Sequence, residues 1–170
     1  TVKEQILPSY TFRKIKIKKK EEIHIVTQYH FRVWPDHGVP HTAMALLNFR
    51  NKVKNDMTSS NGPVLVHCSA GVGRTGTFIG LDLLIDEAEE KRRINILSCL
   101  IALREERPHM VQNKEQYIFL HKAMVQWATL GQTIIPSDQF NETFASYRTS
   151  LNKQPSHLEL QFKCLRDILV

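Results

Sequence analysis

The sequence predicts an α/β fold in which helices flank a twisted mixed sheet, and three observations support that prediction. Residues 23–33 alternate between apolar and polar side chains, which is typical of a half-buried strand, and the preceding residues 11–18 are expected to be extended too. The short apolar run Val64–Val66 is typical of a strand that is buried on both faces. A glycine-rich loop and a helix follow that run, so a site is expected at the carboxyl end of the strand.

Helical spacing of apolar residues predicts four helices before Gly131 and two after it. Pro108 ends the third helix, and Gly131 caps the fourth. Ser156 and Glu159, three residues apart, form a capping box before the last helix. The first four expected ranges are 42–55, 75–92, 96–106 and 114–130. The apolar stripes of the last two helices consist of Phe140, Phe144, Tyr147 and Leu151, and of Leu158, Phe162, Leu165 and Leu169.

The composition is that of an ordinary soluble globular protein, with 170 residues, 42% apolar and 24% charged. Three cysteines without a CxxC pair indicate a reducing compartment, so the chain is expected inside the cell, and neither a metal nor a cofactor is expected. No apolar run approaches the roughly 18 residues that span a bilayer. The chain begins at Thr1 rather than at a methionine, which suggests a piece of a longer protein.

The net charge of +6 does not by itself predict nucleic-acid binding. Much of the lysine excess lies between Lys14 and Lys20, and Glu21 and Glu22 follow at once, as in a solvated strand and its turn. A basic surface does favour anionic substrates through electrostatic steering, and phosphorylated peptides are one such class.

A cysteine, five residues and an arginine separate the expected strand from the expected helix, from Cys68 to Arg74. Glycines let the backbone curl so that successive N–H groups point inward, and the helix adds the positive end of its dipole. Such a loop is a phosphate cradle. Its N–H groups and the Arg74 guanidinium would lower the thiol pKa of Cys68, and Arg74 would pair with two phosphoryl oxygens.

The alternative for Cys68 is a buried, inert cysteine beside a glycine turn. A bare Cys-x5-Arg spacing would leave that alternative open, but the whole string HCSAGVGRTG in this context favours the cradle. Cys99 and Cys164 lie among or beside apolar helical residues and are expected to be packing residues.

Three segments resemble the signature segments of phosphotyrosine-specific protein tyrosine phosphatases: Trp34–Pro40, Val66–Phe78 and Met110–Tyr117. They occur in the family's order. The resemblance implies that residues 1–131 are the C-terminal part of a phosphatase catalytic domain whose N-terminal part is missing. Residues 132–170 resemble the linker and first helices of a second, truncated phosphatase domain, as in tandem receptor-type enzymes.

The resemblance also implies a role for each matching residue. Cys68 is the nucleophile, Asp36 the general acid and then base, and the Thr75 hydroxyl stabilises the departing thiolate. Gln112, assisted by Gln116, positions the attacking water. His67 tunes the cysteine and Trp34 anchors the acid-bearing loop. The residues expected to contact substrate are His67, Ser69, Ala70, Gly71, Val72, Gly73, Arg74, Asp36, Gln112 and Trp34.

Phosphotyrosine-containing proteins are therefore the expected substrates, with a second phosphatase domain as a partner in the same chain. The receptor-type resemblance implies a location on the cytoplasmic side of a membrane, attached only through a transmembrane segment outside this sequence. Two departures from the family are visible: the substrate-stacking Lys-Asn-Arg-Tyr segment is absent, and Asn113 stands where threonine is usual.

Three alternatives remain open at this stage. The cradle is shared with dual-specificity and lipid phosphatases, although the Trp34–Pro40 loop and Gln112 argue against both. A phosphotyrosine-binding module without turnover would be expected to lack the acid or the glutamine, and both are present. The 170 residues alone could also be inactive.

Overall fold

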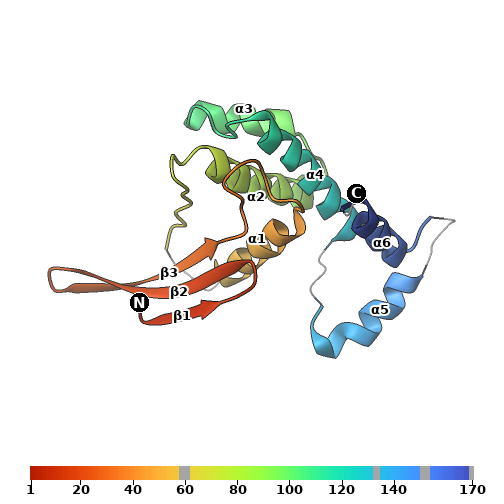
Figure 1. Ribbon diagram of the computed structural model, residues 1–170, viewed down its shortest axis with the longest axis horizontal. Helices are drawn as coiled ribbons and strands as arrows, with labels where there is room; N and C mark the ends of the chain where they lie inside the picture. The colour runs from red at the N-terminus through yellow and green to blue at the C-terminus, as the bar shows by residue number, and fades with distance from the viewer. Residues whose placement is uncertain (58–61, 132–134, 150–153, 169–170) are drawn as a thin grey trace.

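The computed structural model describes residues 1–57, 62–131, 135–149 and 154–168, the last five of them by their backbone only. It confirms a fold that combines helices and strands, with three strands before a set of helices (Figure 1). The sheet was expected to be mixed, but every pair among the described strands is antiparallel. Leu151 and Leu169, and the side chains of Cys164 and Leu165, lie outside the described parts. The elements are β1 (Lys3–Ile6), β2 (Tyr10–Lys19), β3 (Glu22–Phe31), α1 (Met44–Met57), α2 (Gly73–Lys91), α3 (Ile96–Glu106), α4 (Lys114–Leu130), a 3-10 turn η1 (Ser137–Gln139), α5 (Phe140–Arg148) and α6 (His157–Ile168).

The three strands form an antiparallel sheet in the order β1-β2-β3, and the turn expected beside Glu21 and Glu22 joins β2 to β3. Lys20 turns the chain there with a φ of 54°. The prediction that the strand at residues 23–33 is half-buried is confirmed only at the end of β3 next to α1, where Phe31 packs against Phe49. Towards the turn it is wrong, since Ile23 and Ile25 are 51% and 57% exposed. There the sheet extends beyond the core residues.

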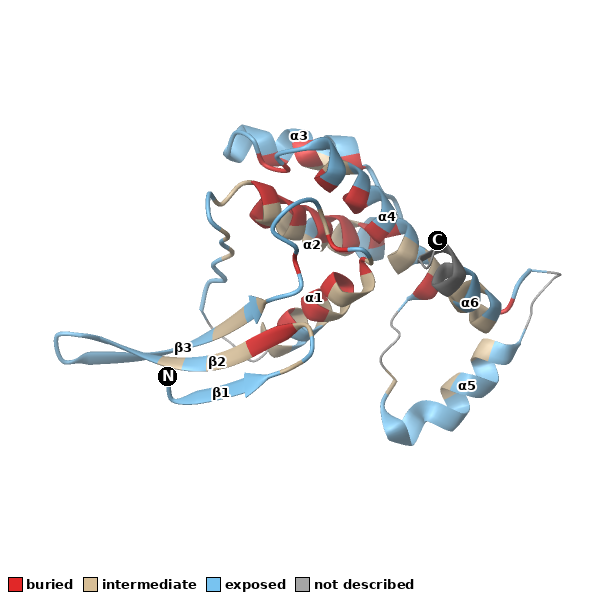
Figure 2. Ribbon diagram, in the orientation of Figure 1, coloured by how far each residue is buried: buried red, intermediate tan, exposed pale blue. Residues whose placement is uncertain are grey.

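The core lies between the base of the sheet and helices α1 to α4, as the buried segments in Figure 2 show. Helix α2 is central, because it contacts α1, α3 and α4. The largest fully buried apolar side chains include Leu46, Leu81, Leu84, Ile85 and Leu120. This packing fixes α2, and therefore fixes the loop that leads into it.

The predicted strand at Val64–Val66 is not formed. Val64 is 49% exposed and Leu65 86% exposed, whereas both were expected to be buried. A strand exists only where a neighbour completes its hydrogen bonds, and within the described residues only β1, β2 and β3 pair with one another. The segment still leads through the cysteine loop into α2, as expected.

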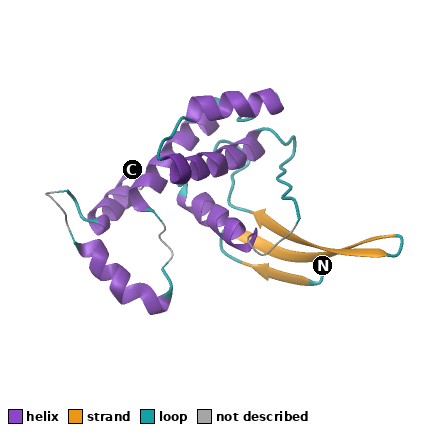
Figure 3. Cartoon of the chain, turned by 180° about the vertical axis from the view of Figure 1, so that it is seen from behind, coloured by secondary structure: helices purple, strands orange, loops and turns teal. Residues whose placement is uncertain are grey.

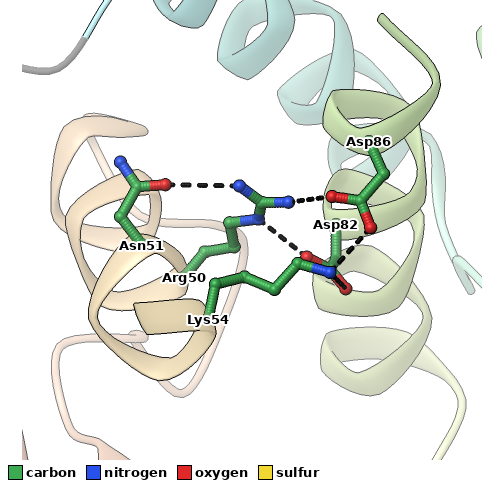
Figure 4. A network of polar contacts seen from close by, with 5 residues as sticks. All are labelled: Arg50, Asn51, Lys54, Asp82 and Asp86. Atoms are coloured by element: carbon green, nitrogen blue, oxygen red, sulfur yellow. Dashed lines mark hydrogen bonds and ion pairs between the residues drawn. The ribbon is translucent and has the colours of Figure 1, made fainter. Parts of the chain in front are cut away.

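A network of charged side chains joins α1 to α2 (Figure 4). Arg50 is only 5% exposed, and its Nε donates to Asp82 at 2.7 Å while another of its nitrogens pairs with Asp86. Lys54 donates to Asp86 at 2.6 Å and lies 3.4 Å from Asp82. Two cations thus face two carboxylates, so the buried guanidinium is fully compensated.

Helices α5 and α6 lie beyond the C-terminal end of α4, away from the hairpin (Figure 1, Figure 3). The predicted capping box is present: the Ser156 N–H donates to Glu159 at 2.6 Å, and the Glu159 N–H donates back to Ser156 Oγ at 3.3 Å. His157 attaches α6 to α4 through the Leu130 carbonyl oxygen, 2.7 Å from its Nε2. None of the described helices is both long and apolar enough to cross a membrane.

Candidate active site

The loop from Cys68 to Val72 curls at the start of α2, as the cradle prediction requires. Gly71 has a φ of 72°, in the left-handed region that glycine adopts without strain, and its N–H donates to the Cys68 sulfur at 3.2 Å. Helix α2 begins at Gly73, and no side chain caps it. The first N–H groups of a helix lack partners within the helix, so this end is suited to an anion.

Hydrogen bonds tune the Cys68 thiol. Its partial burial alone would raise the pKa, but the Thr75 hydroxyl and the N–H groups of Thr75, Gly71 and Val72 outweigh that effect and lower the pKa to about 7. The Thr75 hydroxyl is buried and has no hydrogen-bond partner among the described residues, so it remains available to the nearby thiolate whose pKa it lowers. A substantial fraction of Cys68 is therefore thiolate at neutral pH.

Arg74 connects the cradle to the loop that carries the predicted acid. Its Nη2 donates to the Pro35 carbonyl oxygen at 3.0 Å, so the loop of Asp36 lies against the guanidinium. Asp36 itself is exposed. The buried Trp34 anchors the loop, because its indole N–H donates to the Gly38 carbonyl at 3.2 Å. The structure thus brings Trp34 and Asp36 to the cradle. Pro35, between them, contacts Arg74 although the two residues are 39 positions apart in the sequence.

Gln112 and Gln116 both reach the start of α2. A Cβ atom added to Gly73 would lie 2.9 Å from Gln116 Nε2 and 3.1 Å from Gln112 Oε1, so only glycine leaves room for both amides. The buried Gln116 accepts from the Gln112 N–H at 2.8 Å. Gln116 therefore holds the Gln112 backbone in place. Asn113, the departure from the family pattern, caps α4 by accepting from the Gln116 N–H at 2.9 Å.

The remaining predicted residues line the same loop with less burial. His67, Ser69 and Ala70 are exposed. The Nδ1 of His67 lies 3.3 Å from the Cys68 carbonyl oxygen, so the imidazole is adjacent to the nucleophile through the backbone rather than through the sulfur.

Two arginines near the end of α3 contact the site, although they belong to none of the three motif segments. Arg107 donates to the Ala70 carbonyl at 3.0 Å, and its guanidinium lies 3.3 Å from the place that a Cβ of Gly71 would occupy. Arg104 donates to the carbonyls of Met110 at 2.9 Å and Val111 at 2.7 Å, just before Gln112. Their position shortly before Pro108, between the two motif segments, is the only sequence signal for them.

The loop that contains Val111 and Gln112, here called the glutamine loop, also contacts the cradle through its backbone. Val111 has a φ of 59°, an unusual value for a β-branched residue, and its N–H donates to the Val72 carbonyl at 3.1 Å. The backbone of this loop approaches α2 so closely that a Cβ on Gly76 would lie 2.5 Å from the Val111 nitrogen. The glutamine loop and the cradle therefore form one unit.

A nucleophile-type cysteine in an anion cradle, next to an arginine and two glutamines, defines a phosphatase-like site, and comparison with known proteins agrees with that assignment. The family model for protein-tyrosine phosphatase matches residues 1–126. The chain belongs to the protein-tyrosine phosphatase family.

Curated relatives of the chain include receptor-type members. Receptor-type tyrosine-protein phosphatase U of Gallus gallus is 37% identical, over 98% of this chain and 12% of that protein. Tyrosine-protein phosphatase 99A of Drosophila melanogaster is 38% identical, over 95% of this chain and 12% of that protein. Receptor-type tyrosine-protein phosphatase eta of Gallus gallus is 45% identical, over 73% and 9%. The chain thus spans about an eighth or less of the curated relatives it matches.

Proposed function

We propose that this chain carries the catalytic residues of an enzyme that hydrolyses phosphotyrosine in proteins through a cysteinyl-phosphate intermediate. The observation that carries the proposal is the thiol of Cys68, with a pKa lowered to about 7, at the open N-terminal end of α2. The neighbouring Arg74 supplies a planar cation that matches two phosphoryl oxygens, which a lysine does not.

In the first step, the Cys68 thiolate attacks phosphorus and the bond from phosphorus to the tyrosine oxygen breaks. Phenol has a pKa near 10, so its anion is a poor leaving group at neutral pH. The Asp36 carboxyl group donates a proton to that oxygen, and tyrosine leaves uncharged. The contact from Arg74 to the Asp36 loop supports this role, because it holds the loop against the phosphate site.

In the second step, water attacks the cysteinyl phosphate. Gln112 positions the water, the Asp36 carboxylate accepts its proton, and the bond from sulfur to phosphorus breaks to release inorganic phosphate. The Thr75 hydroxyl stabilises the departing thiolate by donating to it. Gln116 acts here through Gln112, whose backbone N–H it holds, rather than through the water.

The substrate class rests on the combination of the Trp34–Pro40 loop with Gln112 and on the names of the relatives, which are tyrosine-protein phosphatases. Dual-specificity and lipid phosphatases share the cradle and are the alternative. Comparable rates of the full-length protein on phosphotyrosyl, phosphoseryl and phosphoinositide substrates would contradict the assignment to phosphotyrosine.

The receptor-type names of the relatives support a membrane-anchored parent protein whose phosphatase domain lies on the cytoplasmic side. Residues 132–170 are then the linker and the beginning of a second phosphatase domain. Helices α5 and α6 lie outside the core and leave Phe140 and Phe162 52% and 69% exposed, which fits helices that belong to another packing unit.

The decisive experiment is to trap the intermediate. The full-length protein is mixed with a radiolabelled phosphotyrosyl peptide and quenched with acid within milliseconds to seconds. Label on the peptide that contains Cys68 is expected, with more label in Gln112→Ala, because the second step slows. A protein that turns over without label on Cys68 would overturn the covalent mechanism, and a protein that binds the peptide without turnover would establish a binding module instead.

A further inference from the structure

The hairpin of β2 and β3 has no part in the proposed catalytic site, and the side chains of its outer half are largely exposed. It projects away from the helices, and its end is exposed throughout (Figure 1, Figure 2). Most residues of this half are basic or aliphatic, and Glu21 and Glu22 lie at its turn. Such a composition on a regular, two-stranded surface needs a physical explanation.

The strand register places the lysines on one face. Side chains of directly paired residues lie on the same side of a sheet, and those of residues two apart along a strand share that side. Lys18 pairs with Ile23, Lys16 with Ile25 and Lys14 with Thr27, and Lys3 of β1 pairs with Lys14. We call this set the lysine face: Lys3, Lys14, Lys16, Lys18, Ile23, Ile25 and Thr27.

The lysine face carries no acidic residue. Glu4 and Glu22 pair with Arg13 and Lys19, which point to the opposite side. Glu21 lies in the turn, 3.6 Å from the nitrogen of Lys18, where it neutralises part of the charge at the tip. Four like charges on one small surface repel one another, so the face is complementary to an anionic surface rather than to water alone.

The aliphatic members make the partner more specific. Ile23 and Ile25 are 51% and 57% exposed and are paired with lysines rather than with other apolar groups. A lipid interface accepts this mixture, because aliphatic side chains enter the boundary between headgroups and acyl chains while long lysines reach the headgroups.

We propose that the outer half of the hairpin binds the surface of a membrane that contains anionic lipids, with the lysine face towards the lipid. Nucleic acid fits less well, since single-strand readers combine cations with exposed aromatic rings and the lysine face has none. The aromatic residues of the two strands, Tyr10, Phe12, Tyr29 and Phe31, instead belong to or pack against the core at the base of the sheet. Binding would hold the phosphatase domain against the bilayer and limit the substrates within its reach.

The test measures sedimentation with phosphatidylcholine vesicles, with and without phosphatidylserine, for a soluble protein that contains all of residues 1–170. The wild-type protein is expected to bind only the vesicles with phosphatidylserine. The triple variant K14Q/K16Q/K18Q is expected to bind them roughly a hundredfold more weakly, from about 1 kcal/mol for each lysine near an anionic surface. The variant I23S/I25S should also bind more weakly, by a loss that remains at high salt, since salt screens only the charges.

The matched control is K91Q/K122Q/K163Q, which removes the same charge from exposed helical positions. This control should bind like the wild type. Equal losses in the two triple variants would show that net charge alone is responsible and would overturn the proposal. Equal binding to vesicles without phosphatidylserine would overturn it too, as would retention on polyglutamate without retention on either vesicle, which would assign the face to an acidic protein. Circular dichroism checks that each variant is folded.

Discussion

The first turn of α2 and its middle turns both gather polar groups, but the two regions differ in how those groups are satisfied. At and just before the first turn, N–H groups and the Thr75 hydroxyl lower the pKa of one thiol, and no side chain caps the helix. In the middle turns, Asp82 and Asp86 face Arg50 and Lys54, and each charge has its partner within the protein. The donors of the first region are left for a substrate, whereas the charges of the second are already paired within the protein.

This difference separates activity from stability along one helix. Groups that wait for a ligand contribute little to folding, whereas a buried charge that loses its partner costs several kcal/mol. Substitutions near Cys68 should therefore change catalysis without changing unfolding, and substitutions at the ion network should do the reverse. Four predictions test this, in order of decreasing effect, with activities measured on the full-length protein.

Replacement of the proposed nucleophile should have the largest effect. Cys68→Ser is expected to lower kcat by roughly 10⁴-fold or more, because a hydroxyl is a far weaker nucleophile and nothing else forms the covalent intermediate. Its melting temperature should match that of the wild type. Cys99→Ser is the control: burial raises the thiol pKa of Cys99, which lies on α3 away from the cradle, and activity should persist. Retained turnover in Cys68→Ser would refute the nucleophile assignment.

Breaking the ion network should cost stability alone. In Arg50→Ala the carboxylates of Asp82 and Asp86 lose their hydrogen bonds to the guanidinium but keep Lys54, so the free energy of unfolding should fall by about 1.5–3 kcal/mol, measured by urea denaturation. Lys52→Ala on the same helix is the control. Lys52 is 47% exposed and pairs with Asp56 at the surface, so its loss should cost at most about 1 kcal/mol. Similar costs for the two variants would show that the Arg50 network has no special role.

Two glycines of α2 provide a matched pair. Gly76→Ala places a methyl group 2.5 Å from the backbone nitrogen of Val111, and the glutamine loop must shift, at a cost of about 1–3 kcal/mol together with lower activity. In Gly80→Ala the nearest atoms are leucine methyl groups at 3.4 Å or more, so the helix should gain up to about 1 kcal/mol. Thermal unfolding and phosphatase rates of both variants check this. An unchanged rate in Gly76→Ala would separate the glutamine loop from catalysis.

The smallest effect concerns pH. The Cys68 pKa of about 7 predicts that alkylation by iodoacetamide accelerates as pH rises through 7, because the thiolate is the reactive form. Thr75→Val removes one donor, so the pKa should rise and the curve should move to higher pH. A rise of one unit would cut the thiolate fraction at pH 7 from about one half to about one tenth. Ser98→Val, on the exposed part of α3, should leave the curve in place. A Thr75→Val curve that coincides with the wild-type one would contradict the donor role.

The helices could be predicted from the sequence because their ends carry local signals. The ranges 96–106 and 114–130 agree with α3 and α4, whose N-terminal caps Asn95 and Asn113 accept from Ser98 and Gln116. The cradle was equally readable, since its glycines and Arg74 occur within one short segment. Local chemistry of this kind is contained in the sequence itself.

The errors concern contacts between distant segments. Val64–Val66 has the composition of a buried strand, but strand formation depends on a neighbouring strand, which the run itself does not reveal. Arg104 and Arg107 donate to backbone carbonyl oxygens, which every residue has. The segments that accept these bonds therefore carry no sequence signal for them. Arg50 did carry a signal: it lies four residues after Leu46 and three before Val53, on the buried stripe of its helix.

The positions of Arg104 and Arg107 have a mechanical consequence. They lie within one turn of each other, the first on the last turn of α3 and the second just after it, yet Arg107 holds the rim of the cradle and Arg104 holds the loop of Gln112. Packed helices move as rigid bodies rather than bending locally. A small displacement of this end of α3 would therefore withdraw the phosphate cradle and the water-positioning loop together. Under the proposed mechanism, movement of α3 would therefore affect both the attack by Cys68 and the hydrolytic step that Gln112 serves.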